Sequence, residues 1–486
     1  MGTRVTELPV APLDAATRTL CAQVYWDTGF AREAEELLRG DGYSAIGPPV
    51  GLNLPSILQH TRHSLRIRRR RDWALLACWV LAAFCIAGPL LITRGTKDFP
   101  PTVFGVACGV GSVAALAWTI GTAARWLRVY AAFALLRASA SPLASAPPLP
   151  ADVHGEIVAD QGSNVVCYSA ACATPFDGYG EVVDGKVNVG LPLAMVPVWG
   201  EKADKAGKNG GNGKYDEHDR GTAPPARRVD ATDLHIFLRN EMSRDSGVQG
   251  LQVVSNLFVR GDAANGVNGL WPGGKETRPS RQAHALIYSA GINDPGDRAQ
   301  TYLTFQAVRH GGMLAVTMHV RIRQQHERMS LEIASAVAAP LAGKYTTAGG
   351  SLPRTVRGLR AHARWYALME LPVALTEAWS GPLLRFVTRR LVLRDTVTTR
   401  NAIRGGRMPD RGARTSLRCW TMDPAKILYQ EEADARDILQ RLRKALFDHL
   451  VRYFELHGIA TDELLRVRDN ILVADVSFSR GVTSAG

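Results

Sequence analysis

The chain has 486 residues, a formal net charge of +13 at pH 7 and 46% hydrophobic residues. Its mean hydropathy of −0.07 excludes a polytopic transporter built mostly of membrane helices, and it fits about two soluble modules with a small membrane fraction. The seven Cys are scattered along the chain, so we expect free thiols in a reducing compartment and no disulfide framework.

The N-terminal segment, 1–72, is predicted to be helical and cytosolic. Between residues 14 and 40, apolar side chains such as Leu20, Val24 and Phe30 recur at helical spacing, with charged residues between them. Pro48 and Pro49 end this pattern, because proline interrupts a helix.

Two apolar segments, 73–92 and 103–124, follow. A helix of about 20 residues spans the ~30 Å hydrocarbon layer of a bilayer. Both segments are apolar on all sides, whereas the helices of a soluble hairpin have a polar face. The first apolar run begins too far along the chain for a secretory signal. We therefore predict a transmembrane hairpin over 73–124.

The charges that flank the hairpin predict its orientation. Arg residues cluster before the first span and after the second, whereas the joining loop is short and carries few charges. The positive-inside rule then places both termini in the cytosol and the protein in the cytoplasmic membrane. The residues that set this topology are Arg62, Arg66, Arg68, Arg69, Arg70, Arg71, Arg125 and Arg128.

Gly105 and Gly109 form a G-x-x-x-G pair in the second span. Such a pair lets another helix backbone approach closely. It packs either against the first span of the same chain or against a second copy, which would give a homo-oligomer.

After a juxtamembrane helix and a Pro/Ser/Ala linker over 125–150, the chain is predicted to form a β-rich cytosolic domain over 151–346. Short apolar runs bounded by turn residues indicate strands at 164–168, 181–189, 191–198, 251–259, 284–288, 302–308, 313–322 and 329–333. A helix capped by Asp230 or Thr232 lies between them. The polar, Gly-rich stretch 201–227 is predicted to be a disordered insert.

The last region, 352–486, is rich in Arg and predicted to be helical. Helices are expected over 355–379, with a kink or an end near Pro372, and over 382–393, 431–457 and 462–468, before a strand at 470–478. The predicted fold class is therefore a membrane-anchored α+β protein, with a two-helix transmembrane hairpin, a mixed and mainly antiparallel sheet domain, and C-terminal helices.

Searches for catalytic motifs give no catalytic, cofactor-binding or metal-binding residue. The sequence contains no phosphate loop, H-E-x-x-H, paired C-x-x-C or G-x-S-x-G motif. An enzyme or ligand sensor stays open as the alternative, with a site that the sheet domain assembles from distant residues such as Asp177, Glu181, His284 and His319.

The unusual electrostatic feature is the segment 354–418, in which fourteen Arg and no Lys stand against Glu370, Glu377, Asp395 and Asp410, a net charge near +10. Three interpretations compete for its basic and aromatic face: an anionic membrane surface, an acidic protein partner, and nucleic acid or plain solvation, which we weigh least. The candidate partner-binding or lipid-binding residues are Arg354, Arg357, Arg360, Arg364, Trp365, Arg385, Arg389 and Arg390.

The segments 20–38 and 164–181, the Arg run at 68–71 and the double span together resemble a group of uncharacterised actinobacterial two-span membrane proteins with a large cytosolic domain. The resemblance covers about the first two hundred residues. It implies the same topology, and it carries no activity and no functional residue to this chain.

The function that we expect from these observations is a non-enzymatic anchor or adaptor, which docks a cytosolic protein assembly at the cytoplasmic membrane. A secretion or contractile injection particle, a division complex and a signalling complex all fit as that assembly. A transport component ranks last, because two spans enclose no path without oligomerisation.

Overall fold

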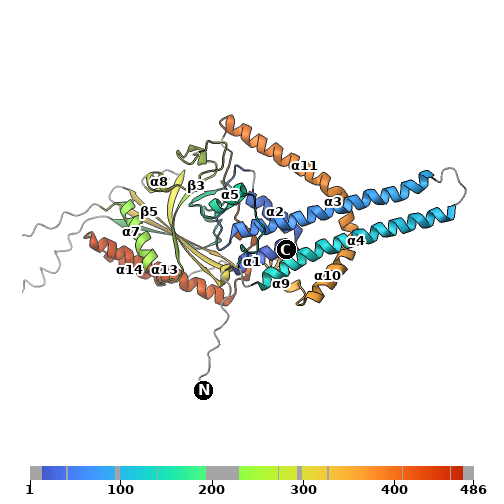
Figure 1. Cartoon of the computed structure of the whole chain (residues 1–486). Helices are drawn as coiled ribbons and strands as arrows, with labels where there is room; N and C mark the ends of the chain where they lie inside the picture. The colour runs from blue at the N-terminus through green and yellow to red at the C-terminus, as the bar shows by residue number, and fades with distance from the viewer. Residues whose placement is uncertain are drawn as a thin grey trace, which may run out of the picture. The chain divides into compact units, whose positions relative to one another are not determined.

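The computed structural model describes residues 14–39, 42–92, 99–138, 141–192, 229–271, 273–292, 298–325, 328–407, 409–459 and 461–473. The chain folds into two compact units, each assembled from three separate segments (Figure 1). Unit 1 comprises Met1–Tyr43, Leu52–Gln161 and Leu341–Arg407, and unit 2 comprises Ser44–Gly51, Gly162–Pro340 and Met408–Gly486. The segment predicted as one Arg-rich helical region thus contributes to both units. The predicted insert 201–227 lies outside the described residues.

The described part of unit 1 is helical. Its long elements are α3 and α4, of 39 residues each, which pack side by side as a hairpin about 58 Å long (Figure 1). Its helices are α1 (Ala15–Trp26), α2 (Thr28–Arg39), α3 (Leu54–Ile92), α4 (Phe99–Arg137), α5 (Ala151–Gln161), η5 (Gly343–Tyr345), α9 (Thr347–Ser351), α10 (Val356–Met369) and α11 (Leu371–Arg404).

The predicted spans 73–92 and 103–124 lie within α3 and α4. Among the described residues one helical stretch, Gly105–Arg137, is long and apolar enough to cross a membrane. Only 11% of its apolar window is buried, whereas the core helix of a soluble protein is mostly buried. The side chains of α3 from residue 88 onward lie outside the described residues.

Local sequence explains where the helices of unit 1 break. Asp27 separates α1 from α2, and its side chain accepts hydrogen bonds from the N–H groups of Gly29 and Phe30 at the start of α2. Pro372 lies in the first turn of α11, where its missing N–H costs no helical hydrogen bond. The predicted end of a helix near Pro372 is therefore confirmed, because α10 ends at Met369. The predicted separate helix 382–393 is part of α11.

Unit 2 is built on a curled, six-stranded mixed sheet in the order β1-β3-β4-β5-β6-β2 (Figure 1). The pair β1–β3 is parallel, and the pairs β3–β4, β4–β5, β5–β6 and β6–β2 are antiparallel. A mixed, mainly antiparallel sheet is therefore confirmed. The strands are β1 (Val165–Tyr168), β2 (Glu181–Pro192), β3 (Gln252–Arg260), β4 (Ala299–Arg309), β5 (Leu314–Gln325) and β6 (Arg328–Ala338).

Unit 2 also contains helices. They are α7 (Ala231–Arg244), η2 (Ala264–Gly266), α8 (His284–Leu286), η3 (Ile287–Ile292), η4 (His310–Gly312), α12 (Leu417–Thr421), η6 (Pro424–Lys426), α13 (Tyr429–Leu456) and α14 (Asp462–Val473). Asp230 caps α7 by accepting from the N–H of Thr232, as predicted.

Two predicted strands are wrong. Residues 284–288 form α8 and the first part of η3, because a short apolar run without alternating polar residues fits a strand and a helix equally well. Residues 470–473 continue α14, and the rest of the predicted strand 470–478 lies outside the described residues.

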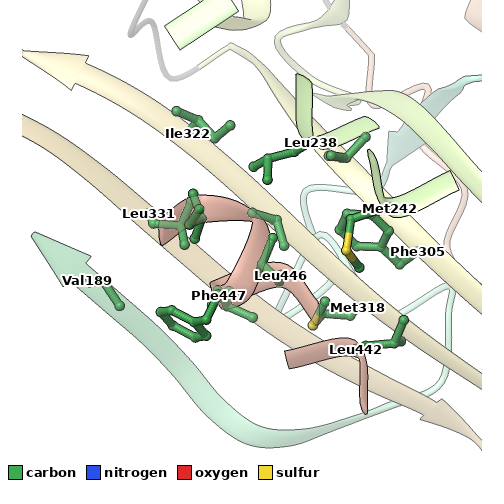
Figure 2. Close-up of a cluster of buried hydrophobic side chains, with 14 of the residues drawn as sticks. Val189, Leu238, Met242, Phe305, Met318, Ile322, Leu331, Leu442, Leu446 and Phe447 are labelled. Carbon is green, nitrogen blue, oxygen red and sulfur yellow. The ribbon is translucent and has the colours of Figure 1, made fainter. Parts of the chain in front are cut away.

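The main core lies between one face of the sheet and the helices α7 and α13 (Figure 2). Alternate residues of β5, such as Met318 and Ile322, point to this face because side chains alternate along a strand. Leu442, Leu446 and Phe447 of α13 pack against them and are fully buried. Burial of such side chains stabilises the fold by about 1.5–3 kcal/mol each.

Candidate functional sites at the hairpin base and on the sheet

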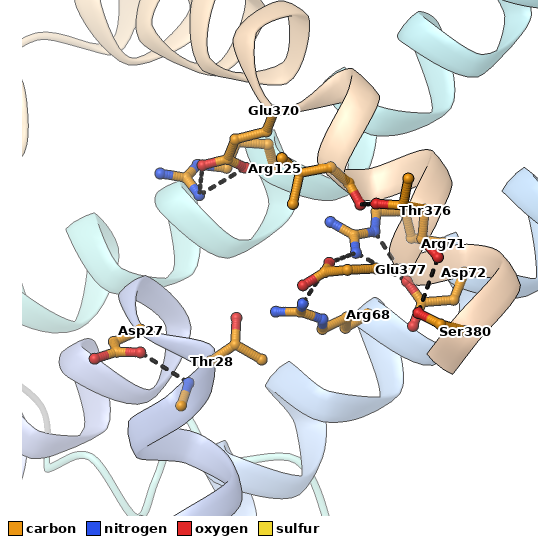
Figure 3. Close-up of polar contacts among 12 residues, drawn as sticks. Asp27, Thr28, Arg68, Arg71, Asp72, Arg125, Glu370, Thr376, Glu377 and Ser380 are labelled. Carbon is orange, nitrogen blue, oxygen red and sulfur yellow. Dashed lines mark hydrogen bonds and ion pairs between the residues drawn. The ribbon is translucent and has the colours of Figure 1, made fainter. Parts of the chain in front are cut away.

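An ionic cluster joins the hairpin to the start of α11 (Figure 3). Arg68 Nη2 lies 2.6 Å and Arg71 Nη2 3.3 Å from Glu377 Oε2, and Arg71 also pairs with Asp72 at 2.9 Å. The side chains of Arg68 and Arg71 are 11% and 8% exposed. We call these four residues the hairpin-base cluster. Burial lowers the pKa of Arg68, and the carboxylate of Glu377 opposes that shift.

A second ion pair binds α4 to the end of α10. Arg125 Nη1 lies 3.1 Å from Glu370 Oε1 (Figure 3). The Arg125 guanidinium also lies over the rings of Trp26 and Tyr366. Arg128 is buried nearby and donates to Thr28 Oγ1 at 3.3 Å. The two ion pairs therefore hold both helices of the hairpin to the Arg-rich segment.

The residues predicted to set the topology consequently fall into two groups. Arg68, Arg71, Arg125 and Arg128 are buried or half-buried in contacts within unit 1, and Arg62 lies 3.6 Å from Glu35. The exposed residues are Arg66, Arg69 and Arg70.

Apolar contacts continue from the hairpin-base cluster into the predicted spans. Ala374 and Ala378 of α11 pack with Leu75 of α3 and Val113 of α4, and Trp79 Nε1 donates to the carbonyl of Leu375 at 3.1 Å. The start of α11 thus lies beside the first two turns of the first predicted span.

The two glycines of the G-x-x-x-G pair in α4 have different surroundings. A Cβ at Gly109 would lie 3.2 Å from Cys85 Cβ of α3, whereas a Cβ at Gly105 would meet nothing within 4 Å. Gly109 therefore permits the close approach of α3 and α4, and Gly105 faces open space.

Helix α10 extends along α4 in the opposite direction. Trp118 Nε1 donates to the carbonyl of Arg364, and Arg137 Nη2 donates to the carbonyl of Arg354, at the two ends of this contact. The buried side chains of α10 are Leu359, Ala363 and Ala367.

One exposed flank of α10, beside its buried face, is basic. The exposed residues Arg357, Arg360 and Arg364 follow one another at three- and four-residue spacing, and we call them the α10 Arg stripe. The Arg360 guanidinium lies 5.5 Å from the ring centroid of Trp126. Arg354 and Trp365 are exposed as well.

Helix α11 carries the other candidate binding residues. Arg390 is exposed, and its guanidinium lies 5.0 Å from the ring centroid of Phe386. The side chains of Arg385 and Arg389 lie outside the described residues.

Sequence reasoning did not identify the acidic partners of this region, and among its tryptophans it proposed only Trp365 as a binding residue. Glu370 and Glu377 stand seven residues apart in a segment otherwise dominated by Arg, and this spacing puts them near one helical face; that pattern could have identified them. The tryptophans of α3, α4, α10 and α11 gather near the boundary between the Arg-rich and apolar parts of the hairpin. They are Trp73, Trp79, Trp118, Trp126, Trp365 and Trp379.

The second candidate site is the sheet face opposite the main core. Asn256 Nδ2 donates to Thr304 Oγ1 at 3.0 Å, and the Thr304 hydroxyl is also hydrogen-bonded to His319 Nδ1 at 3.0 Å. The ring of Phe176 stacks on His319 with centroids 4.5 Å apart. Burial lowers the pKa of His319 to about 3, so its imidazole is neutral at pH 7.

Further along β5, Arg321 is almost fully buried. Its Nη1 lies 3.9 Å from Glu332 Oε2, and Tyr302 donates to the other carboxylate oxygen at 3.3 Å. Thr317 Oγ1, His319 Nε2 and Arg321 Nε have no hydrogen-bond partner among the described residues. This face therefore has unsatisfied donors beside a neutral imidazole.

The other residues of the predicted alternative site lie elsewhere in unit 2. The Asp177 carboxylate accepts from the N–H of Thr174 at 3.2 Å, Glu181 begins β2 opposite Val337, and His284 begins α8. Within the described ranges, no group of three or more His, Cys, Asp or Glu residues could hold a metal ion. All seven Cys are free, and burial raises the pKa of Cys167 to about 12.

Comparison with known proteins gives one match. The AbeC-like domain matches residues 201–483. This range includes the strands β3–β6 and every helix from α7 to α14, so it covers α10 and α11 of unit 1 as well as the helices of unit 2. The match begins beyond α3, α4 and β2, so it does not concern the hairpin. No curated protein and no solved structure matches the chain. Because the matched residues make up more than half of the sequence, the chain belongs to the AbeC-like domain family.

Proposed function

We propose that this protein is a non-enzymatic membrane anchor that docks a cytosolic protein assembly. In this proposal the α3–α4 hairpin crosses the cytoplasmic membrane twice, both termini lie in the cytosol, and the α10 Arg stripe binds an acidic surface of the assembly.

The apolar surface of the hairpin supports the membrane part of the proposal. Large apolar side chains of α3 and α4 are exposed, among them Trp79, Phe84, Val110 and Leu116. An exposed apolar surface on a hairpin about 58 Å long is costly in water, and a bilayer about 30 Å thick covers it. The exposed Arg66, Arg69 and Arg70 at one end of that surface favour a cytosolic base.

The direction of α10 carries the adaptor part. Arg354 contacts Arg137, which follows the end of the second predicted span by thirteen residues, or about 20 Å of helix. Arg357 and Arg360 of the α10 Arg stripe then lie on the cytosolic side of this span, whereas the backbone of Arg364 contacts Trp118 inside it. Exposed guanidinium groups on the cytosolic side of the span can form bidentate pairs with the carboxylates of a protein.

A ligand sensor is the second candidate function. The unpartnered polar atoms of Thr317, His319 and Arg321 favour it, because buried donors without partners cost free energy unless water or a ligand satisfies them. A site of this kind would respond to a small ligand with acceptor groups.

Co-purification of the full-length protein from its native membranes tests the adaptor proposal. The variant R357E/R360E/R364E reverses the α10 Arg stripe, and the variant R239E/R244E/R441E makes the same charge change at exposed residues of α7 and α13. We expect a cytosolic protein to be retained by the wild type and the control, and to be lost with the stripe variant. A protein that is retained equally by all three, or a wild type that comes out alone, contradicts the adaptor proposal.

A further inference from the structure

Helix α11 carries an exposed apolar stripe that the docking role of α10 does not explain. Trp379, Phe386, Leu393 and Val397 are 71, 56, 51 and 55% exposed. Their spacing of seven, seven and four residues puts them on one face of the helix over about 27 Å. We call these four residues the α11 apolar stripe.

Basic side chains lie along the same face. Arg390 and Arg394 are exposed, and Arg390 covers the ring of Phe386. Over its whole length α11 contains six Arg against Glu377 and Asp395. Exposed aromatic and aliphatic side chains interleaved with Arg are typical of a helix in the interface of an anionic bilayer.

Contacts at the start of α11 determine where this face lies. Glu377 pairs with Arg68 and Arg71, immediately before the apolar part of α3 begins. The next residue, Ala378, belongs to the same apolar cluster as Cys78, which lies inside the predicted span. Helix α11 therefore starts at the boundary between the charged and apolar parts of the hairpin, and it then runs at a slant away from the hairpin tip, toward the end where α1 and α2 lie (Figure 1).

We propose that α11 passes through the headgroup layer of the cytoplasmic leaflet, where Trp379 at the start of its apolar stripe reaches the acyl chains and Arg390 and Arg394 bind anionic phospholipid headgroups. This inference rests on the proposed insertion of the hairpin. The boundary position selects lipid over a protein partner, because the stripe begins at the depth where the first span begins. Tryptophan is also the side chain that bilayer interfaces favour, and Trp379 is the most exposed member of the stripe.

Quenching of tryptophan fluorescence by brominated lipid tests the position of α11. The full chain is reconstituted in phosphatidylcholine bilayers with brominated acyl chains, and the emission of Trp379 is taken as the difference between the wild type and W379F. The difference for W79F reports the hairpin in the same way. We expect both residues to be quenched by bromine and shielded from aqueous iodide.

The two reporters separate this inference from the proposed function. If Trp79 is quenched by bromine while Trp379 is quenched only by iodide, the hairpin is inserted and the inference about α11 is wrong. If Trp79 is also unaffected by bromine, the hairpin is outside the bilayer, and the proposed anchor fails together with the inference.

The headgroup preference is tested with a small fraction of brominated lipid in phosphatidylcholine. Each Arg near an anionic surface changes partitioning about fivefold. Brominated phosphatidylglycerol should therefore quench Trp379 several-fold more than brominated phosphatidylcholine. R390Q/R394Q should abolish this preference, and R239Q/K444Q, with the same charge change on α7 and α13, should keep it. Equal quenching by the two lipids in the wild type overturns the binding of anionic headgroups.

Discussion

Replacement of Glu377 by Gln should detach the start of α11 from the hairpin. The variant keeps the shape of the side chain and removes the charge that faces Arg68 and Arg71 at 2.6 and 3.3 Å (Figure 3). Arg71 keeps Asp72 as a partner, whereas Arg68 loses the carboxylate that balances its burial.

The cost follows from how far the cluster is buried. Loss of one partner from a fully buried ion pair costs about 3–5 kcal/mol, and loss of an exposed pair costs about 0–1 kcal/mol. The Arg side chains are 11% and 8% exposed but Glu377 is 40% exposed, so water replaces part of what the carboxylate provides. We therefore expect a loss of about 2 kcal/mol, or roughly a thirtyfold increase in local opening.

Hydrogen exchange of the full-length protein in detergent measures this opening at the amides of α11. D437N is the matched control, because it breaks the exposed i,i+4 pair between Asp437 and Arg441 and should change stability by less than about 0.5 kcal/mol. The charge-swapped variant R68E/E377R should recover part of the protection. Exchange in E377Q that equals exchange in D437N would refute the role assigned to the hairpin-base cluster.

The remaining predictions concern unit 2. Phe447→Ala should lower the free energy of unfolding by about 3–5 kcal/mol, because it leaves a cavity at a fully buried position between α13 and the sheet. Glu455→Ala, on the exposed face of α13, is the control. Equal denaturant midpoints for the two variants would contradict the packing. Acid should also destabilise the fold. Burial lowers the pKa of His319 to about 3 and that of His235 to about 4, from an ordinary value of 6.5, so the unfolded chain binds protons that the folded chain does not. Stability is therefore fully present above about pH 6.5 and falls toward pH 4, by up to about 1.4 kcal/mol per pH unit for each His. H319Q should reduce this slope in denaturant unfolding at pH 5, 6 and 7, and an unchanged slope would be evidence against a neutral, buried His319.

Local patterns predicted the elements of unit 2 well, because the apolar alternation of β5 and the cap at Asp230 act over a few residues. The strand predicted at 284–288 was wrong, because five residues without alternation do not distinguish a helix from a strand. Helix α11 was predicted as two pieces, with the second beginning at Pro382, whereas the structure has one continuous helix there. A proline inside a helix usually interrupts it.

The hairpin-base cluster was beyond local patterns. Arg68 and Glu377 are 309 residues apart, and nothing in the spacing of the Arg residues indicates which of them are paired. The Arg run at 68–71 was interpreted as a topology signal because it adjoins an apolar segment. Its structural role depends on a carboxylate that only the folded chain brings close.

This long separation has a consequence for biogenesis. During synthesis Arg68 emerges 309 residues before Glu377, and Arg125 emerges 245 residues before Glu370. In the proposed topology, these arginines have no acidic partner from α10 or α11 while the hairpin inserts, and they would act as positive charges that retain its base in the cytosol. Once the ribosome has released α10 and α11, the same arginines become the attachment points for these helices. The same arginines would thus first direct insertion of the hairpin and later bind α10 and α11 to it.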